Sequence, residues 1–142
     1  MVKKKEKEIH TVGKRRMAIA RAVVKPGKGE VKINSTPLNL WGNEPLRMWI
    51  KEPLVIAEDI PKSVDINVHT RSGGIVGQAE AVRMAIAKGL VEYSNDKGLR
   101  EKYLQYDRNL LVYDPRRNES HHGSGRGASK RGSRRHKQRS KR

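Results

Sequence analysis

The composition of this 142-residue chain changes abruptly after Pro115, and the change limits how much of it can fold. Residues 116–142 carry eleven Lys or Arg, one acidic residue and one aliphatic side chain, Ala128. Such a polar segment cannot bury enough apolar surface to offset the conformational entropy lost on ordering. We therefore expect a short basic lead over 1–8, a globular domain over 9–115, and an extended basic tail over 116–142 that is ordered only by a polyanion.

The globular part is large enough for one modest core, because a domain of about 100 residues buries roughly 60–70% of its unfolded surface. The chain has no Phe, so Val, Ile, Leu, Ala and Met have to build that core. It has no Cys, which excludes disulfide scaffolds and thiolate zinc sites. No apolar run approaches the roughly 20 residues of a membrane span, and no signal-peptide core follows the charged start. We expect a cytoplasmic protein with no membrane partner.

Alternating apolar and polar residues predict strands in the first half of the chain. The stretch 12–25 is expected to be one strand, which a Pro/Gly loop over 26–29 joins to a second strand at 31–33. This arrangement predicts a β-hairpin. A further strand is expected at 64–69, where Val and Ile alternate with polar residues.

Helical spacing dominates the second half. An interrupted helical segment is expected over 38–58, with a break or restart at Pro53. The strongest helix is expected at 75–92, a shorter helix at 97–105, and a last strand at 110–113.

The helix at 75–92 carries small residues four apart, at Gly77, Ala81, Ala85 and Gly89. Such a stripe lets a helix axis approach a neighbouring layer closely. We favour packing on a sheet over contact with RNA.

The tail is typical of a polyanion-binding segment, because like charges at this density repel one another and need a counter-surface. Arg outnumbers Lys eight to three in 116–142. A guanidinium forks onto phosphates and stacks on unpaired bases, which favours folded RNA over a plain duplex.

A second basic cluster comprises Lys14, Arg15 and Arg16, which together with Arg21 are expected to form a rim that contacts RNA. A solvated strand end explains the same residues equally well.

Two glycine-containing loops are candidate phosphate sites. The loop 25–29 lacks the Gly-Lys-Ser/Thr ending of a phosphate loop, so we interpret it as a hairpin turn. The loop 72–74 precedes a helix, where free backbone N–H groups attract an anion. An RNA phosphate and an ordinary helix start are equally consistent with it.

Catalysis finds little support in the sequence. The five His residues are scattered, at positions 10, 69, 121, 122 and 136, without the spacing of a metal site. The carboxylates lie among basic neighbours with no isolated pair. We therefore expect no enzyme activity, no cofactor, no metal and no small-molecule substrate.

Several of these motifs together resemble one family, that of small ribosomal subunit protein nine, whose eukaryotic counterpart is numbered sixteen. The resemblance covers essentially the whole chain and rests on residues 12–22, 72–81, 87–90, 106–112, 114–117 and 140–142. Residues 106–117 resemble the archaeal and eukaryotic branch, and the short chain suits an archaeon. The chain departs from the family at three places. Ser72 stands where the family usually has glycine, and Arg16-Met17 replaces the usual Lys-Thr. Residues 121–138 differ in sequence from the family's usual tail.

The resemblance implies an α+β fold, a two-layer sandwich in which helices cover a four-stranded sheet, similar to domain two of small-subunit protein five. It implies a place in the head of the small subunit, with small-subunit rRNA, peptidyl-site tRNA and other head proteins as partners. Its implied rRNA-binding residues are Lys14, Arg15, Arg16, Arg21, Arg108, Arg116, Arg117, Arg126, Lys130, Arg131, Arg134, Arg135, Lys137 and Arg139. Its implied tRNA-contacting residues are Ser140, Lys141 and Arg142.

Two other functions stay open on the sequence alone. One is a free-standing RNA-binding or chaperone-like protein. The other is a small phosphate-handling enzyme, since related folds include sugar kinases and the protein of ribonuclease P.

Overall fold

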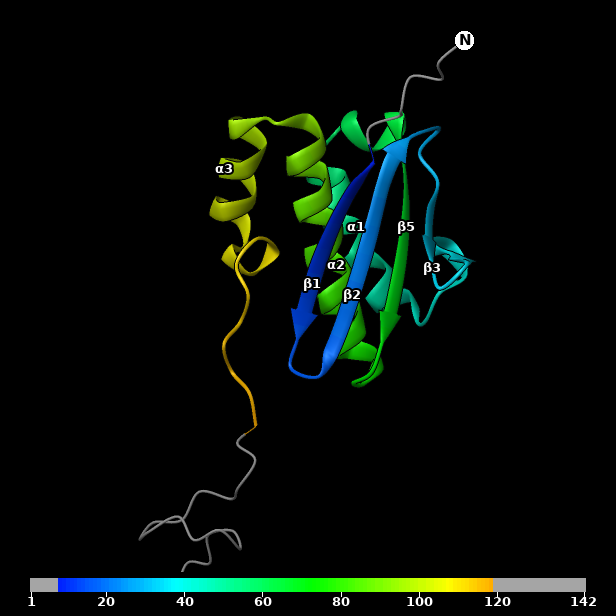
Figure 1. Ribbon diagram of the computed structural model, residues 1–142, viewed down its shortest axis with the longest axis vertical. Coiled ribbons are helices and arrows are strands. Elements are labelled where there is room, and N and C mark those ends of the chain that lie inside the picture. Colours follow the sequence, from blue (N-terminus) through cyan, green and yellow to red (C-terminus); the bar gives the residue numbers. More distant parts are fainter. Residues whose placement is uncertain (1–7, 119–142) are drawn as a thin grey trace, which may run out of the picture.

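One mixed β-sheet organises the computed structural model, which describes residues 8–118 (Figure 1). Within those residues the strands are β1 (Ile9–Arg15), β2 (Ala18–Pro26), β3 (Val31–Ile33), β4 (Thr36–Pro37) and β5 (Val64–Arg71). Their order across the sheet is β1-β2-β5-β3-β4. The β1–β2, β2–β5 and β3–β4 pairs are antiparallel, whereas β3 runs parallel to β5.

The first hairpin lies where the sequence predicted a single strand. Arg15 pairs with Ala18, so Arg16 and Met17 form a two-residue turn between β1 and β2. Arg16 has φ +52°, a left-handed conformation that usually favours Gly or Asn. The prediction of one strand over 12–25 was wrong because neither turn residue carries the usual turn signal.

The predicted hairpin between β2 and β3 is also wrong, because β5 inserts between these two strands. The Pro/Gly loop crosses the start of β5 instead. The Oδ1 atom of Asp65 accepts hydrogen bonds from the backbone N–H groups of Lys28 (2.8 Å), Gly29 (3.1 Å) and Glu30 (3.0 Å). These bonds lower the pKa of Asp65, the bond from Glu30 most.

Helices cover one face of this sheet. They are α1 (Glu44–Ile56), α2 (Ile75–Ser94) and α3 (Lys97–Tyr106), with short 3-10 turns η1 (Leu38–Leu40), η2 (Ile60–Ser63) and η3 (Arg108–Leu110). The helices expected at 75–92 and 97–105 are confirmed as α2 and α3. No helix in residues 8–118 has the length and apolar character needed to cross a membrane.

Two predictions around the helices were wrong. Pro53 does not interrupt α1: its ring is buried in the core, and its carbonyl accepts a 2.6 Å hydrogen bond from the Tyr103 hydroxyl. The interruption lies earlier, between η1 and α1. Residues 110–113 form no strand. Asp107 caps the 3-10 turn η3 by accepting a hydrogen bond from the N–H of Asn109, and Leu110 at the end of this turn is buried in the core.

The small-residue stripe of α2 faces the sheet, as predicted. A Cβ atom at Gly13 of β1 would overlap the backbone of Ala81 and Ala85, so the two elements meet at nearly their closest approach. The Thr11 hydroxyl donates a 2.8 Å hydrogen bond to the Ala85 carbonyl in the same contact. A Cβ atom at Gly89 would lie only 2.6 Å from Cγ2 of Val24. Aliphatic and small side chains thus fill most of the core, and Tyr103 adds a fully buried aromatic ring that was not predicted there from the sequence.

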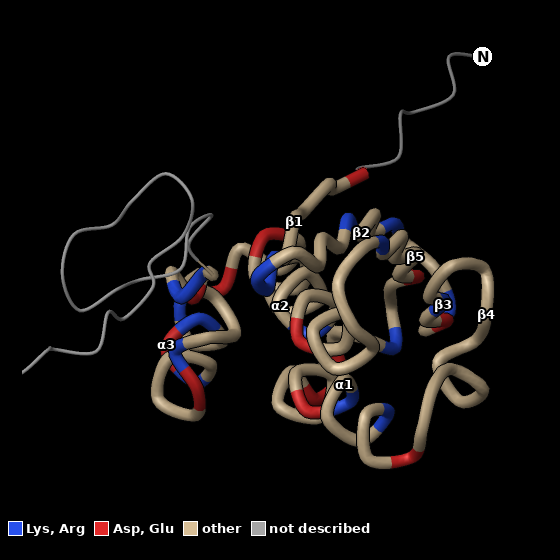
Figure 2. The backbone as a smooth tube through the Cα atoms, turned by 90° about the horizontal axis from the view of Figure 1, so that it is seen from below, with Lys and Arg blue, Asp and Glu red and all other residues tan. Residues whose placement is uncertain are grey.

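Strand side chains alternate between buried and exposed, with the buried ones toward α2. The helices lie on one side of the sheet, and no described segment covers the other (Figure 2). This confirms the two-layer α+β sandwich, and the two-residue β4 is an addition to the four strands expected.

Candidate nucleic-acid interface

Four segments from three distant parts of the sequence meet at one end of the domain, the lower end in Figure 1. They are the turn of the β1–β2 hairpin, the loop 72–74 after β5, the first turn of α2, and residues 117–118 where the description of the chain ends. Together they line a hollow of about 600 Å³. We call this region the hairpin end.

The loop at the hairpin end presents the start of α2 without a side-chain cap. Ser72 and Gly73 are both left-handed, with φ of +65° and +68°. The Gln78 side chain donates to the Ser72 carbonyl (3.1 Å), and the first helical bond runs from the Gln78 N–H to Gly74 (2.9 Å). No side chain caps the first turn, so its N–H groups and the positive end of the helix dipole face this end. The local chemistry favours an anion, one of the two interpretations left open by the sequence.

Two arginines flank this helix start. Arg16 is exposed at the turn, beside Met17, and no described residue pairs with it. Arg117 donates a hydrogen bond to the Tyr113 hydroxyl, and its guanidinium lies 5.4 Å from the centre of the Tyr113 ring. Both guanidiniums therefore keep donor groups available for an incoming phosphate.

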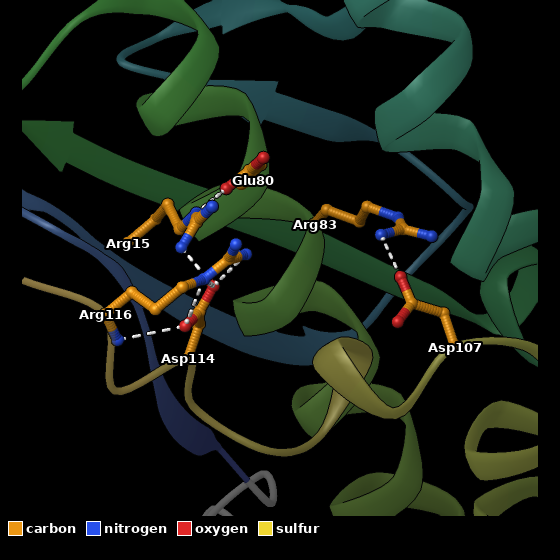
Figure 3. Close-up of polar contacts among 6 residues, drawn as sticks. All are labelled: Arg15, Glu80, Arg83, Asp107, Asp114 and Arg116. Atoms are coloured by element: carbon orange, nitrogen blue, oxygen red, sulfur yellow. Dashed lines mark hydrogen bonds and ion pairs between the residues drawn. The ribbon is translucent and has the colours of Figure 1, made fainter.

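Arg15 behaves differently from its neighbour, because it lies between two carboxylates. It forms ion pairs with Glu80 of α2 and with Asp114 near the end of the described chain (Figure 3). Asp114 also accepts bonds from Arg116, at 3.0 Å to the backbone N and 2.7 Å to Nη2. We call Arg15, Glu80, Asp114 and Arg116 the exit cluster, since they tie the hairpin to the start of the basic tail.

The electrostatics of the exit cluster keep Asp114 ionised. Hydrogen bonds from the Arg116 side chain and backbone, followed by the positive charges of Arg116 and Arg15, hold the pKa of Asp114 far below its usual range. The Asp114 residue is 7% exposed, whereas the Arg116 side chain is 74% exposed. Arg116 thus turns one edge toward Asp114 and leaves the rest of its guanidinium in solvent.

A second internal arginine lies deeper, on α2. Arg83 is buried, packs over the Trp49 ring at 5.7 Å, and pairs with Glu52 and with Asp107 (2.7 Å; Figure 3). This cluster joins α1, α2 and the segment before η3. It explains how the chain positions the C-terminal part of the domain.

The structure distributes the remaining sequence-predicted residues over other surfaces. Lys14 and Arg21 are exposed on the helix-free face of the sheet, and Arg108 is exposed on η3 outside the hollow. The predicted residues Arg126, Lys130, Arg131, Arg134, Arg135, Lys137, Arg139, Ser140, Lys141 and Arg142 lie outside the described residues.

Sequence reasoning missed Glu80, Arg83, Asp107 and Asp114. Two signals were present: an arginine inside the otherwise apolar stretch of α2, and single carboxylates beside basic motifs. Within residues 8–118, no group of His, Asp and Glu is arranged to hold a metal ion.

The chain matches a known protein family over most of its length. The family model described as ribosomal protein S9/S16 matches residues 13–142. The matched range begins within β1 and includes the whole hairpin end and every candidate residue named above.

Proposed function

The chain belongs to the ribosomal protein S9/S16 family, and from this premise we propose that its basic residues serve two RNAs, small-subunit rRNA and peptidyl-site tRNA. Membership itself makes the protein a structural, non-enzymatic component of the small subunit of the cytoplasmic ribosome. It binds rRNA and assembles with other ribosomal proteins. Neither the free-standing RNA-binding protein nor the phosphate-handling enzyme is retained.

In this proposal the rRNA contacts begin at the hairpin end and continue along the tail, within the head of the small subunit. The exit cluster supports it most directly, because it holds the start of the basic tail beside the unpaired Arg16 and the uncapped start of α2. Arg16 and Arg117 are then direct phosphate ligands. Arg15 acts through Asp114 by fixing where the tail leaves the domain.

In this proposal the tail reaches RNA that is farther away than the RNA at the hairpin end. A segment of 27 residues spans on the order of 90 Å when extended, at about 3.3 Å per residue. We assign Ser140, Lys141 and Arg142 to peptidyl-site tRNA and the basic residues between Arg116 and Arg139 to rRNA. The division into 1–8, 9–115 and 116–142 and the archaeal-type ancestry belong to the same proposal.

The test compares two charge-neutralised pairs in the tail. Lys141→Gln with Arg142→Gln removes the tip charges, and Arg134→Gln with Arg135→Gln removes two charges further back. In reconstituted small subunits we expect the tip pair to weaken peptidyl-site tRNA binding about tenfold, or about 1.4 kcal/mol, without changing incorporation. The upstream pair is expected to weaken rRNA association and leave tRNA affinity unchanged. Equal tRNA affinity of tip-variant and unaltered subunits would remove the tRNA assignment.

A further inference from the structure

The helix-free face of the sheet carries cations with no acidic partner. Lys14 of β1, Arg21 of β2 and Arg71 of β5 are all exposed, and no carboxylate in residues 8–118 pairs with any of them. By contrast, the two lysines nearer the other end of this face are paired, Lys25 with Glu8 (2.8 Å) and Lys32 with Glu30 (2.7 Å). Uncompensated charge therefore collects toward the hairpin end.

The sheet register places the three unpaired cations side by side. Lys14, Ile19 and Arg71 form one cross-strand row, and Val12, Arg21 and His69 form the next row. Since strands lie about 4.8 Å apart and alternate residues about 6.7 Å, Lys14 and Arg71 are separated by roughly 10 Å, with Arg21 roughly 8 Å from each. Long side chains at these spacings converge on neighbouring phosphates.

The same face lacks acidic competition. Asp65 is the one carboxylate among the outward residues of β1, β2 and β5, and its Oδ1 is occupied by three backbone N–H groups at the far end. The strands carry no Trp or Tyr that would stack on a base. Apolar side chains lie among these cations: Ile19 and Val23 are half-buried, and Val12 is 40% exposed. This chemistry suits a sugar–phosphate backbone rather than bases.

We propose that this open sheet face is an RNA-binding surface in its own right, and that Lys14, Arg21 and Arg71 hold consecutive phosphates of small-subunit rRNA. The inference rests on the proposed rRNA function and extends it to Arg71. The surface is continuous with the hairpin end through Arg16 and the last residues of β5. An RNA strand that reaches the start of α2 thus continues across β5, β2 and β1 without meeting a free carboxylate.

The test uses the full-length protein and deproteinised small-subunit rRNA, with affinity measured across a salt series. Arg21→Gln with Arg71→Gln removes two charges from the sheet face. Lys97→Gln with Arg100→Gln removes two exposed charges from α3 and serves as the matched control. Each lost phosphate contact lowers the steepness of the log affinity–log salt slope by about 0.7–0.9. We expect a decrease of roughly 1.4–1.8 for the sheet pair and no decrease for the control.

Further variants keep the outcome interpretable. Arg21→Lys with Arg71→Lys preserves point charges and is expected to keep the original slope, which excludes a folding defect as the cause. If the sheet pair leaves the slope unchanged while Arg134→Gln with Arg135→Gln lowers it, the sheet-face proposal is overturned and the tail proposal stands. If both pairs leave it unchanged, both proposals fail. Unchanged rRNA affinity with reduced occupancy in fully reconstituted subunits would assign the face to a protein partner and also overturn the proposal.

Discussion

At the hairpin end of the sheet lie the Arg16 turn and the start of α2, whereas the loop Gly27–Glu30 and the start of β5 form the opposite end. Both ends contain a loop with two glycines, at least one left-handed residue and charged side chains. At the opposite end Asp65 accepts hydrogen bonds from three loop N–H groups, and Lys25 and Lys62 form ion pairs with Glu8 and Asp59. At the hairpin end Arg16 and the α2 N–H groups keep no partner among the described residues. The comparison teaches that free backbone N–H groups beside an unpaired arginine, rather than charge density, distinguish the proposed interface.

The two loops predict the largest difference in stability. A Cβ atom at Gly73 would lie 2.9 Å from the backbone N of Ala18, and φ is +68°. A Cβ atom at Gly29 would lie 3.3 Å from the Lys62 Cα, with φ +93°. We expect Gly73→Ala to lower the free energy of unfolding by about 3 kcal/mol and Gly29→Ala by about 1.5 kcal/mol, because only the first adds overlap to left-handed strain. Urea denaturation of the RNA-free protein measures both, and equal costs would contradict the tighter packing inferred for the hairpin end.

Adjacent arginines within the hairpin end provide the next contrast. Arg15→Met leaves Glu80 and Asp114 without their shared partner, and since the Arg15 side chain is 17% exposed we expect a loss of about 2 kcal/mol in unfolding free energy. Arg16→Met is expected to change stability by less than about 0.5 kcal/mol while weakening rRNA binding. Denaturation and rRNA titration of both variants decide the matter. If Arg16→Met unfolds as readily as Arg15→Met, their division into a structural and an RNA-facing residue is wrong.

The smallest expected effect concerns strain at the turn. A left-handed non-glycine residue costs about 1–2 kcal/mol, partly offset by the greater freedom of glycine in the unfolded chain. Arg16→Gly should therefore stabilise the fold by about 0.5 kcal/mol and still reduce rRNA affinity. Ser35→Gly, at φ +67° in the β3–β4 turn, is the matched control and should stabilise similarly with unchanged affinity. A loss of affinity in the control would show that the measurement does not report a local contact.

Features that depend on local interactions were predictable from the sequence, whereas features that depend on residues far apart in the chain were not. Helix α2 was predicted because its small-residue stripe repeats locally, and the strand at 64–69 because its alternation is local. The β1–β2 turn was missed because Arg16 takes its conformation from pairing on both sides rather than from its own preference. The Pro/Gly loop was misassigned as a hairpin turn because β5 inserts between β2 and β3. This strand comes more than thirty residues later in the sequence, so no local pattern indicates it.

The candidate site shows the same limit. In the sequence Lys14, Arg15 and Arg16 form one basic cluster, and no neighbouring residue indicates that their contacts differ. The separation comes from Glu80, on α2, and from Asp114, which is 99 positions from Arg15. A basic motif in sequence therefore identifies cations, and only the fold shows which of them remain available to RNA.

The contact between Arg15 and Asp114 also bears on the order in which parts of the domain form during synthesis. During vectorial synthesis the β1 strand emerges early, and Asp114 follows only after nearly the whole domain has left the exit tunnel. In the nascent chain the residues of the sheet and of α2 are therefore all present before Asp114 can pair with Arg15. The point from which the basic tail leaves the domain is therefore fixed after the rest of the domain is in place.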